Sequence, residues 1–324
     1  MTPPPTISVL TRAYDTNVDL ARRLAGSMLA QRAEWEWVVV DDASSYTAGL
    51  DEIRRQLGDD PRLKLITHDA NQGVVGATAT ALATATGTFV ALLNHDDELH
   101  PNALAEVTAA IEAVEEVDVI YTDEDKIDQT GRHHELPFFK PDWSPERLRC
   151  QMYLGHLLVI RRTLMQRAGG FRPGYDGSQD YDLALRVTEQ ARRIHHIPKV
   201  LYHCRSAPGA VADHIDAKPK ANDAARAALA DHAKRVGLEA DVVDVEPGVY
   251  RLQRHFRDRP APLVSLVVPT RGTSSTVWGQ RRCFVTALAR SLVDQTTYEP
   301  WELVCVADAD TPAAVLEELS GILG

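Results

Sequence analysis

The residues best suited to chemistry follow a short apolar run near position 90. Residues 89–93 read Phe-Val-Ala-Leu-Leu, and Asn94, His95, Asp96 and Asp97 come directly after them. An apolar run of this length predicts a buried strand, which would deliver the polar residues to the carboxyl edge of a sheet. Carboxylate and amide oxygens are ligands for hard divalent cations. The pattern therefore predicts a cation site at this edge of the sheet.

Acidic residues after strands also serve as turn residues and helix caps. A helix start follows at residues 98–101, where Pro101 suits a first turn. One carboxylate of the pair Asp96 and Asp97 can cap this helix while the other stays free. The sequence therefore favours a ligand role over a purely structural one.

Strands alternate with helices through the first hundred residues. The patterns predict strands at 7–10, 35–40 and 63–67, a strand-to-helix loop at 11–17 and a closely packed helix at 76–86. This alternation predicts the α/β class, with a doubly wound, mostly parallel sheet and helices on both faces. In such sheets ligands bind beyond the carboxyl ends of the strands.

The composition narrows the class of partner and the compartment. The chain has 324 residues, a formal charge of −11 and no long Lys/Arg run, which argues against a nucleic-acid surface. Its four cysteines are scattered, as expected for reduced thiols in a cytoplasm. There is no signal-like start and no run long enough for a membrane span. We expect a cytoplasmic protein that can meet a lipid-borne substrate peripherally, at the inner face of the plasma membrane.

Ten short motifs follow one another along residues 6–250. They are Tyr14-Asp15-Thr16, Val38 to Ser44, Asn71-Gln72-Gly73, Leu93 to Asp97, Tyr121 to Lys126, Phe139 to Trp143, Gly155 to Leu158, Gly169-Gly170-Phe171, Gly177 to Asp182 and Leu201-Tyr202-His203. In this order and spacing the chain resembles the inverting glycosyltransferases of family 2, with the GT-A (Rossmann-like) fold. The later motifs resemble bacterial polysaccharide and O-antigen members. No single motif would suffice.

The resemblance implies that residues 6–100 bind a nucleotide-diphosphate sugar. Tyr14 would stack on the base and Asp42 would accept its ring N–H. Asp41 would be a ribose-binding or structural acid, and the implied donor set also contains Asn71 and Asp96. The pair Tyr14 and Asp42 favours UDP or dTDP over GDP. As alternatives, Tyr14 only packs on its loop and the acids cap the following helix.

The resemblance further implies a divalent metal, Mn²⁺ or Mg²⁺. Its implied ligands are Asp96, Asn94, Asp97 and His203. Asn94 stands where relatives carry the first Asp of an Asp-x-Asp signature, so it offers an amide oxygen without charge. Asp97 either binds directly or fixes the loop, and His203 either binds the metal or satisfies a backbone carbonyl.

Residues 101–215 would form the acceptor half, with Asp180 as the general base that takes the proton of the attacking hydroxyl. Asp180 would also suit a cap for a helix at 181–190, and both roles can hold together. The acceptor would be a glycan or lipid-linked glycan. Its implied contacts are Trp143, His156, Asp123 and Gln179. Trp143 could equally anchor its loop, and Asp123 could instead bond nearby groups.

Two departures from the family pattern bear on the donor. Arg12 and Ala13 replace the Pro-Val that commonly precedes the Tyr, and Ala77 and Thr78 stand where many relatives carry an Arg. Any phosphate contact from that helix would have to use backbone N–H groups or hydroxyls.

The C-terminal part repeats the first two strand-helix steps. We expect a glycosyltransferase domain at 1–250 that ends with a packing helix at about 218–238, a linker at 251–262 and a partial second GT-A-like domain at 263–324. In the repeat, Arg271 aligns with Tyr14 and Asp308 with Asp42. The segment from Ser206 to Lys218 is predicted to be a mobile lid over the donor. The repeat contains no second metal-binding strand, so no second catalytic site is expected.

Two rival functions remain. A sugar nucleotidyltransferase would share the sheet, but no Gly-rich phosphate loop with a basic residue follows the first strand. A degenerate carbohydrate-binding or scaffolding domain is compatible with Asn94 and the missing Arg.

Overall fold

The computed structural model describes residues 7–206, 219–255 and 260–323. The chain divides into two compact units, residues 1–254 and 255–324, and each is described by itself. Apart from Ser206, the predicted lid lies outside the described residues. Within the described ranges, no helix has both the length and the apolar character needed to cross a membrane.

Unit 1 is built on one nine-stranded sheet with the order β3-β2-β1-β4-β8-β6-β9-β5, and β7 pairs with β6. Its strands are β1 (Ile7–Ala13), β2 (Trp35–Asp41), β3 (Leu63–Thr67), β4 (Phe89–Leu92), β5 (Glu98–Leu99), β6 (Val117–Ile127), β7 (His134–Phe138), β8 (Leu158–Arg161) and β9 (Arg193–Arg205). The first four strands are parallel to one another, and β8, β5 and β7 add antiparallel pairs. The predicted α/β class is confirmed.

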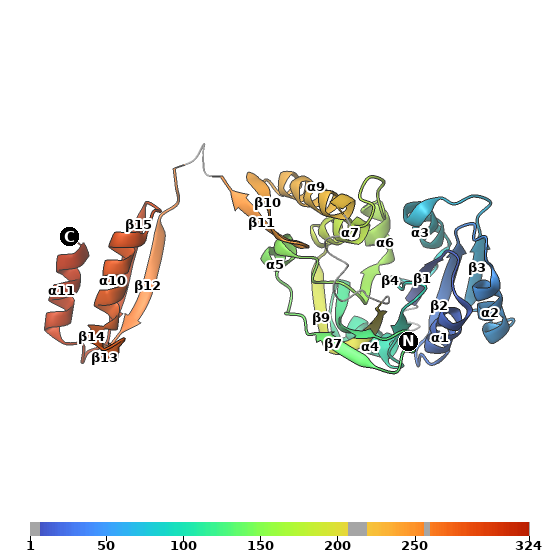
Figure 1. Cartoon of the computed structure of the whole chain (residues 1–324), viewed down its shortest axis with the longest axis horizontal. Helices are drawn as coiled ribbons and strands as arrows, with labels where there is room; N and C mark the ends of the chain where they lie inside the picture. The colour runs from blue at the N-terminus through green and yellow to red at the C-terminus, as the bar shows by residue number, and fades with distance from the viewer. Residues whose placement is uncertain (1–6, 207–218, 256–259, 324) are drawn as a thin grey trace. The chain divides into compact units, whose positions relative to one another are not determined.

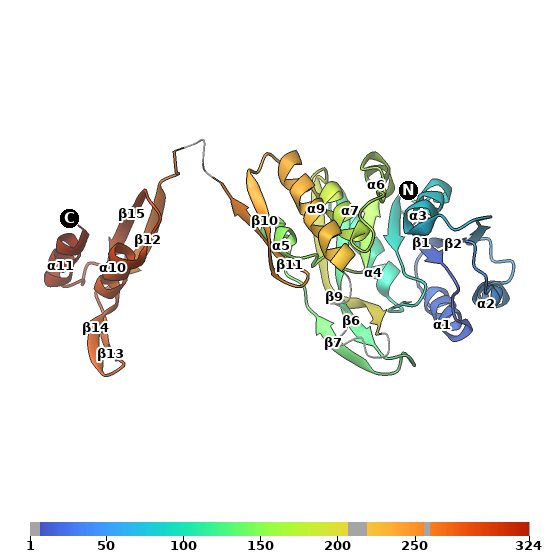
Figure 2. The same cartoon turned by 45° about the horizontal axis from the view of Figure 1, so that its top comes forward.

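Helices cover both faces of this sheet (Figure 1). They are α1 (Val18–Leu29), α2 (Ala48–Leu57), α3 (Gly73–Thr84), α4 (Ala103–Ala113), α5 (Pro145–Cys150), α6 (Arg162–Arg167), α7 (Gln179–Thr188) and α9 (Pro219–Arg235). The hairpin of β10 (Ala240–Glu246) and β11 (Val249–Arg254) follows α9. Helices α7 and α9 lie side by side (Figures 1 and 2), and the Ser178 hydroxyl donates to the Ala221 carbonyl at 2.7 Å.

The alternation of residues along β2 explains the two layers. Trp37 and Val39 pack into one buried cluster with α1 and α2, whereas Val38 and Val40 pack into another with α3 and α7. A strand covered on both faces is apolar at every position, as this one nearly is. Strand β1 is three residues longer than predicted, because Thr11, Arg12 and Ala13 continue the ladder with β2.

The position of the ligand crevice follows from the strand order. The chain moves outward from β1 to β2 and β3, then returns to place β4 on the other side of β1. Ligand crevices in open α/β sheets form at such a switch, beyond the carboxyl ends of the two strands. Here those ends carry Arg12 and the segment 93–97.

One buried carboxylate ties the opposite end of the sheet together. Glu36 on β2 accepts a hydrogen bond from the Ser8 hydroxyl, from the Thr86 backbone N–H at 2.5 Å and from the Lys64 Nζ at 2.6 Å. Burial alone would raise the pKa of Glu36, but these hydrogen bonds outweigh it and lower the pKa to about 2.

We expect Glu36→Gln to destabilise unit 1 by about 3 kcal/mol at neutral pH, since a carboxyl whose pKa falls by that much on folding contributes about this amount. A lowered pKa stabilises the fold above the unfolded value of 4.5 and loses that contribution as the pH falls towards 2. The difference in the free energy of unfolding between wild type and variant, measured by urea unfolding, should therefore become smaller from pH 7 to pH 3. The control is Glu302→Gln in unit 2, where the carboxylate is exposed. Equal stability of wild type and Glu36→Gln at pH 7 would contradict this account.

Unit 2 repeats the first two strand-helix steps of unit 1. It contains β12 (Val264–Thr270), the hairpin β13 (Ser274–Val277) and β14 (Gln280–Cys283), α10 (Phe284–Gln295), β15 (Trp301–Ala307) and α11 (Ala313–Leu323). Val264 pairs with Trp301 as Ile7 pairs with Trp35. The Ser265 hydroxyl donates to Glu302 at 2.6 Å, the counterpart of the Ser8 to Glu36 bond. The hairpin is an addition that the repeat did not predict.

Candidate active site

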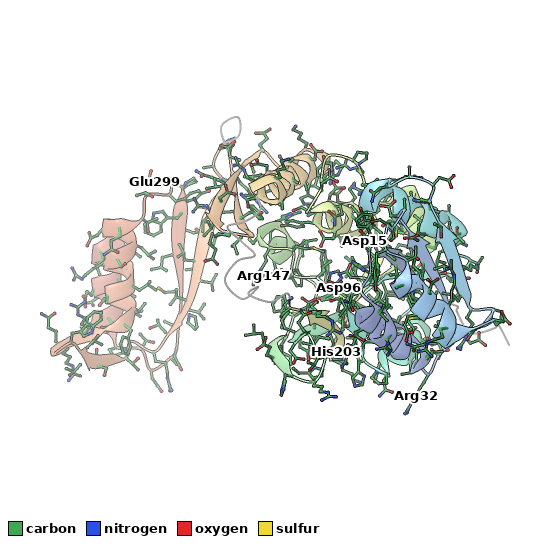
Figure 3. The ribbon with its side chains drawn as sticks, turned by 45° about the vertical axis from the view of Figure 1, so that its right-hand side comes forward. Asp15, Arg32, Asp96, Arg147, His203 and Glu299 are labelled. Carbon is green, nitrogen blue, oxygen red and sulfur yellow. The ribbon has the colours of Figure 1, made fainter. Side chains whose placement is uncertain are left out.

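A cavity of about 340 Å³ lies at the carboxyl edge where β1 and β4 meet. Five of the residues predicted from the sequence line it together: Asn94, Asp96, His156, Gln179 and Asp180. The rest of the lining is Leu10, Arg12, Val74, Thr78, Leu92, Leu93, His95 and Phe171. In Figure 3, Asp96 lies where the N-terminal strands and the later part of unit 1 meet. Motifs from both halves of the unit therefore share one cavity.

Asp96 is a half-buried carboxylate in a negative environment. Burial is the main cause that raises its pKa, and the neighbouring Asp97 raises it further. Its backbone carbonyl accepts a hydrogen bond from Arg205 Nε at 2.7 Å, which fixes the loop. A carboxylate held in this way is costly to keep charged and gains from a cation beside it.

Asp97 is buried and fully engaged in hydrogen bonds. Its carboxylate accepts from the Tyr202 hydroxyl at 2.7 Å, from the Arg205 backbone N–H at 2.7 Å and from Asn94 Nδ2 at 2.9 Å. Of the two roles predicted for Asp97, this geometry favours the one that fixes the loop. Asn94 donates through its nitrogen, and its amide oxygen has no recorded partner in the described part of the chain, so it can accept.

Asp180 lies in the first turn of α7 and lines the cavity. The helix begins after Ser178, so Asp180 is one residue inside it and is not the N-cap. One carboxylate oxygen of Asp180 accepts a hydrogen bond from the backbone N–H of Tyr181 at 2.9 Å. Gln179 turns back to accept from the Gly177 N–H at 2.8 Å. The other Asp180 oxygen has no recorded partner among the described residues and is available to a ligand.

His156 contributes a buried nitrogen without a partner. Its ring stacks on Tyr202, with centroids 4.8 Å apart, and no hydrogen bond is recorded for its Nδ1 within the described part of the chain. The loop that carries it is held by Lys140, whose buried Nζ donates to the His156 carbonyl at 2.7 Å and to Glu124 at 3.1 Å. Burial lowers the pKa of Lys140, and Glu124 partly offsets that effect. The sequence did not predict the pair of Lys140 and Glu124, although both residues lie in motifs that carry the resemblance.

The predicted base-binding residues lie beside the cavity rather than in its lining. Asp42 is fully buried and accepts from the Gln72 N–H at 2.7 Å, from Arg12 at 3.0 Å and from His68 Nδ1 at 3.1 Å. Burial alone would raise the pKa of Asp42, but these three partners lower it. Tyr14 is 40% exposed, and the Arg12 guanidinium carbon lies 5.5 Å from its ring centre.

Four other predicted residues have their recorded partners away from the cavity. Asp41 accepts from the Ser44 hydroxyl at 2.5 Å, and Asn71 accepts from the Gly73 N–H at 3.0 Å. Trp143 packs partly buried against the core, and Asp123 accepts from His196 Nε2 at 2.9 Å and from the Lys140 backbone N–H at 2.8 Å. None of these four side chains is among the described residues that line the cavity.

The structure places His203 with other partners than Asp96. His203 Nδ1 lies 2.7 Å from one oxygen of Asp125, and His134 Nδ1 lies 2.8 Å from the other. In the described ranges no hydrogen bond or ion pair is recorded between His203 and Asp96. These three residues are a group whose ligand atoms are close enough to hold a metal ion.

Arg12 lines the cavity, although the sequence did not indicate a role for it there. It is the one Lys or Arg among the described residues lining the cavity, and it also bonds Asp42 and covers Tyr14. The signal was present, because Arg12 stands where relatives carry Pro. Thr78, on the helix that lacks the family's Arg, lines the same cavity.

Unit 2 has a cavity of about 610 Å³ at the equivalent place, lined among others by Thr270, Arg271, Phe284 and Asp308. Arg271 Nε lies 3.1 Å from Asp308, so an Arg again meets the Asp that follows the second strand. Asp308 is the single carboxylate among the described lining residues. The unit 2 cavity therefore lacks the pair of acids found in unit 1.

Comparisons with known proteins agree with this geometry. Residues 8–169 match the model of glycosyl transferase family 2. The chain is 36% identical over 308 residues to the O-antigen biosynthesis protein RfbC of Myxococcus xanthus, covering 95% of this chain and 23% of the relative. It is also 36% identical to the uncharacterized protein y4gI of Sinorhizobium fredii, covering 99% and 34%. The chain thus spans about a quarter to a third of the length of these relatives.

Solved structures show the same fold. S. aureus TarS 1-349 in complex with UDP-GlcNAc superposes with a TM-score of 0.57 at 20% identity, covering 70% of this chain and 66% of that one. At this identity the likeness concerns the fold alone, which is GT-A. The family match over half the chain, together with a cavity at the switch point of a GT-A sheet, shows that the chain belongs to glycosyl transferase family 2.

Proposed function

We propose that unit 1 transfers a sugar, with inversion, from a nucleotide-diphosphate donor to a hydroxyl of a glycan or lipid-linked glycan. The observation that carries this proposal is the shared cavity, which holds Asp96 from the donor half and Asp180 from the acceptor half. RfbC is named for O-antigen biosynthesis, which supports a polysaccharide acceptor. Such an acceptor would be met at the cytoplasmic face of a membrane.

Asp180 would act as the general base. Asp180 lines the cavity from the first turn of α7, where a hydroxyl that approaches the donor can hydrogen-bond to its second carboxylate oxygen. A carboxylate in that place accepts the proton as the hydroxyl attacks the anomeric carbon. Because the attack comes from the face opposite the leaving diphosphate, a single displacement inverts the configuration.

The residues present fit a divalent cation, Mn²⁺ or Mg²⁺. Asp96 offers a carboxylate and Asn94 a free amide oxygen, and both are hard ligands of the kind these ions prefer. When bound, such an ion neutralises charge on the leaving diphosphate. Asp97, Tyr202 and Arg205 would keep these two ligands in place through their hydrogen bonds.

The donor would enter from the side of Tyr14 and Arg12. TarS is seen with UDP-GlcNAc and with UDP, which supports a uridine or related pyrimidine donor. With Arg12 on Asp42, the base N–H would approach a carboxylate that already has three partners. We therefore assign Asp42 to shaping the base pocket as well as to contacting the base.

A nucleotide panel tests the proposal directly. The full chain is heated with UDP, dTDP or GDP, each with and without Mn²⁺, and its melting temperature is recorded. We expect UDP or dTDP to raise the melting temperature more than GDP and to do so mainly with Mn²⁺, because a ligand that binds the folded state stabilises it. No shift with any nucleotide would remove the basis of the donor site.

We expect Arg12→Ala to weaken UDP binding by about tenfold to a hundredfold, the range for a hydrogen bond to a charged group. Isothermal titration with Mn²⁺ present measures the Kd, and the donor KM should rise with it. The control is Arg54→Ala, which removes an exposed Arg bonded to Asp51 on α2. Unchanged UDP affinity in Arg12→Ala would show that the Arg12 guanidinium binds Asp42 and does not contact the donor.

A further inference from the structure

We propose that Asp125, His134 and His203 bind a divalent transition-metal ion at a second site, separate from the donor cavity. The three side chains come from three strands, β6, β7 and β9, and their ligand atoms lie within 4.8 Å of one another. This site does not depend on the proposed transfer reaction. Of the three residues, only His203 is among the donor-metal ligands that the resemblance implies, and its recorded partner is Asp125 rather than Asp96.

The strand register places the three side chains on one face. Asp125 pairs with His203 across the parallel strands β6 and β9. His134 lies opposite Ile127, two residues beyond Asp125 and therefore on the same face as Asp125. A register shift between Glu124 and Lys126 accompanies this pairing, and such irregularities redirect side chains. The backbone thus converges the two rings on one carboxylate.

The side-chain geometry is close to that of a bound ion. The two Nδ1 atoms lie 2.7 and 2.8 Å from separate oxygens of Asp125, and the ring centroids are 4.7 Å apart with the planes at 83°. A tetrahedral ion with bonds of about 2.0–2.1 Å holds its ligands roughly 3.3 Å apart. Movements on the order of 1 Å would therefore convert these contacts into coordination.

Charge also favours a cation at this place. The Asp125 carboxylate is buried, and among the described residues no Lys or Arg side chain is recorded in contact with it. The two imidazoles are its recorded side-chain partners. A dication held by the three side chains would place positive charge directly beside this carboxylate. Because His134 is half exposed, an ion could enter from solvent and keep a water at its open position.

The ligand set selects the class of ion. Two imidazole nitrogens and one carboxylate oxygen suit Zn²⁺ and its first-row neighbours, whereas Mg²⁺ and Ca²⁺ prefer oxygens alone. An ion held here would join the exposed edge strand β7 to β6 and β9. Figure 2 shows β6 and β7 running together at the margin of unit 1. Next along β9, Tyr202 supports Asp97, so the ion would also steady the donor loop.

The test titrates the chelator-stripped full chain with Zn²⁺ by calorimetry, and with Co²⁺ by visible absorption. We expect one site, with Zn²⁺ affinity reduced at least about tenfold in His134→Ala, since even outer-shell losses cost that much. His134 is half exposed, so its removal should leave the fold intact, which circular dichroism checks. The control is His133→Ala, which removes the exposed neighbouring imidazole.

Asp96→Asn separates the two metal sites. It should leave the Zn²⁺ affinity of the chain unchanged while it removes Mn²⁺-dependent nucleotide binding. Three outcomes would overturn the proposal: no Zn²⁺ binding by the wild type, equal binding by His134→Ala, or loss of Zn²⁺ binding in Asp96→Asn. The last would assign the ion to the donor cavity.

Discussion

Replacing Asp180 with Asn should reduce the rate of sugar transfer by about 10²–10⁴-fold, the usual contribution of a positioned base. The amide keeps the size of the side chain and its place in the first turn of α7, but it cannot take a proton from the acceptor. The donor does not need this carboxylate, so the Kd for UDP should stay near the wild-type value. A radiolabelled donor with an acceptor extract measures the rate.

A structural role for Asp180 would give a different result. An acid in the first turn of a helix stabilises it by about 0.3–1 kcal/mol through the helix dipole. If that were its whole contribution, Asp180→Asn would melt slightly earlier and transfer sugar at the normal rate. Asp176→Asn is the matched control, because Asp176 is an exposed acid in the loop that precedes α7. Transfer by Asp180→Asn as fast as by this control would show that the base lies elsewhere.

The sheet could be predicted from the sequence because its signal is local. The apolar runs at 35–40 and 89–93 form strands that are buried on both faces of the sheet. That they are strands can be inferred from a few neighbouring residues. A doubly wound sheet binds ligands beyond the carboxyl ends of its strands, so the run at 89–93 also predicts that Asn94 and Asp96 lie at the crevice. Both residues do line the cavity.

The partners of the site residues could not be predicted, because they come from distant parts of the chain. Tyr202 and Asp97 are 105 positions apart, and His203 and Asp125 are 78 apart. The residues next to Asp97 in the sequence do not indicate that its carboxylate will accept hydrogen bonds from distant residues. For the same reason the resemblance implies a metal shared by His203 and Asp96, whereas the recorded partner of His203 is Asp125. Motif position identifies the residue, and only the packing of strands decides which atoms it meets.

The second large effect concerns the cation ligands. We expect Asp96→Asn to weaken Mn²⁺-dependent UDP binding by about a hundredfold or more, since even outer-shell losses cost 10–100-fold. Asn94→Asp should act in the opposite direction and tighten Mn²⁺ by about tenfold, or ~1.4 kcal/mol, because it restores a charged ligand. Titration of Mn²⁺ at saturating UDP measures both.

Asn94→Asp should carry a cost that only the metal-free protein reveals. Asn94 Nδ2 now donates to the buried Asp97 at 2.9 Å, and a carboxylate in its place would face Asp97 with like charge. The metal-free variant should therefore melt earlier than wild type, and Mn²⁺ should raise its melting temperature more. Asn102→Asp controls for the added charge, since Asn102 lies outside the cavity and makes no side-chain cap bond to α4. If Asn94→Asp melted earlier and gained nothing from Mn²⁺, position 94 would be a support for Asp97 and Asp96 alone would hold the ion.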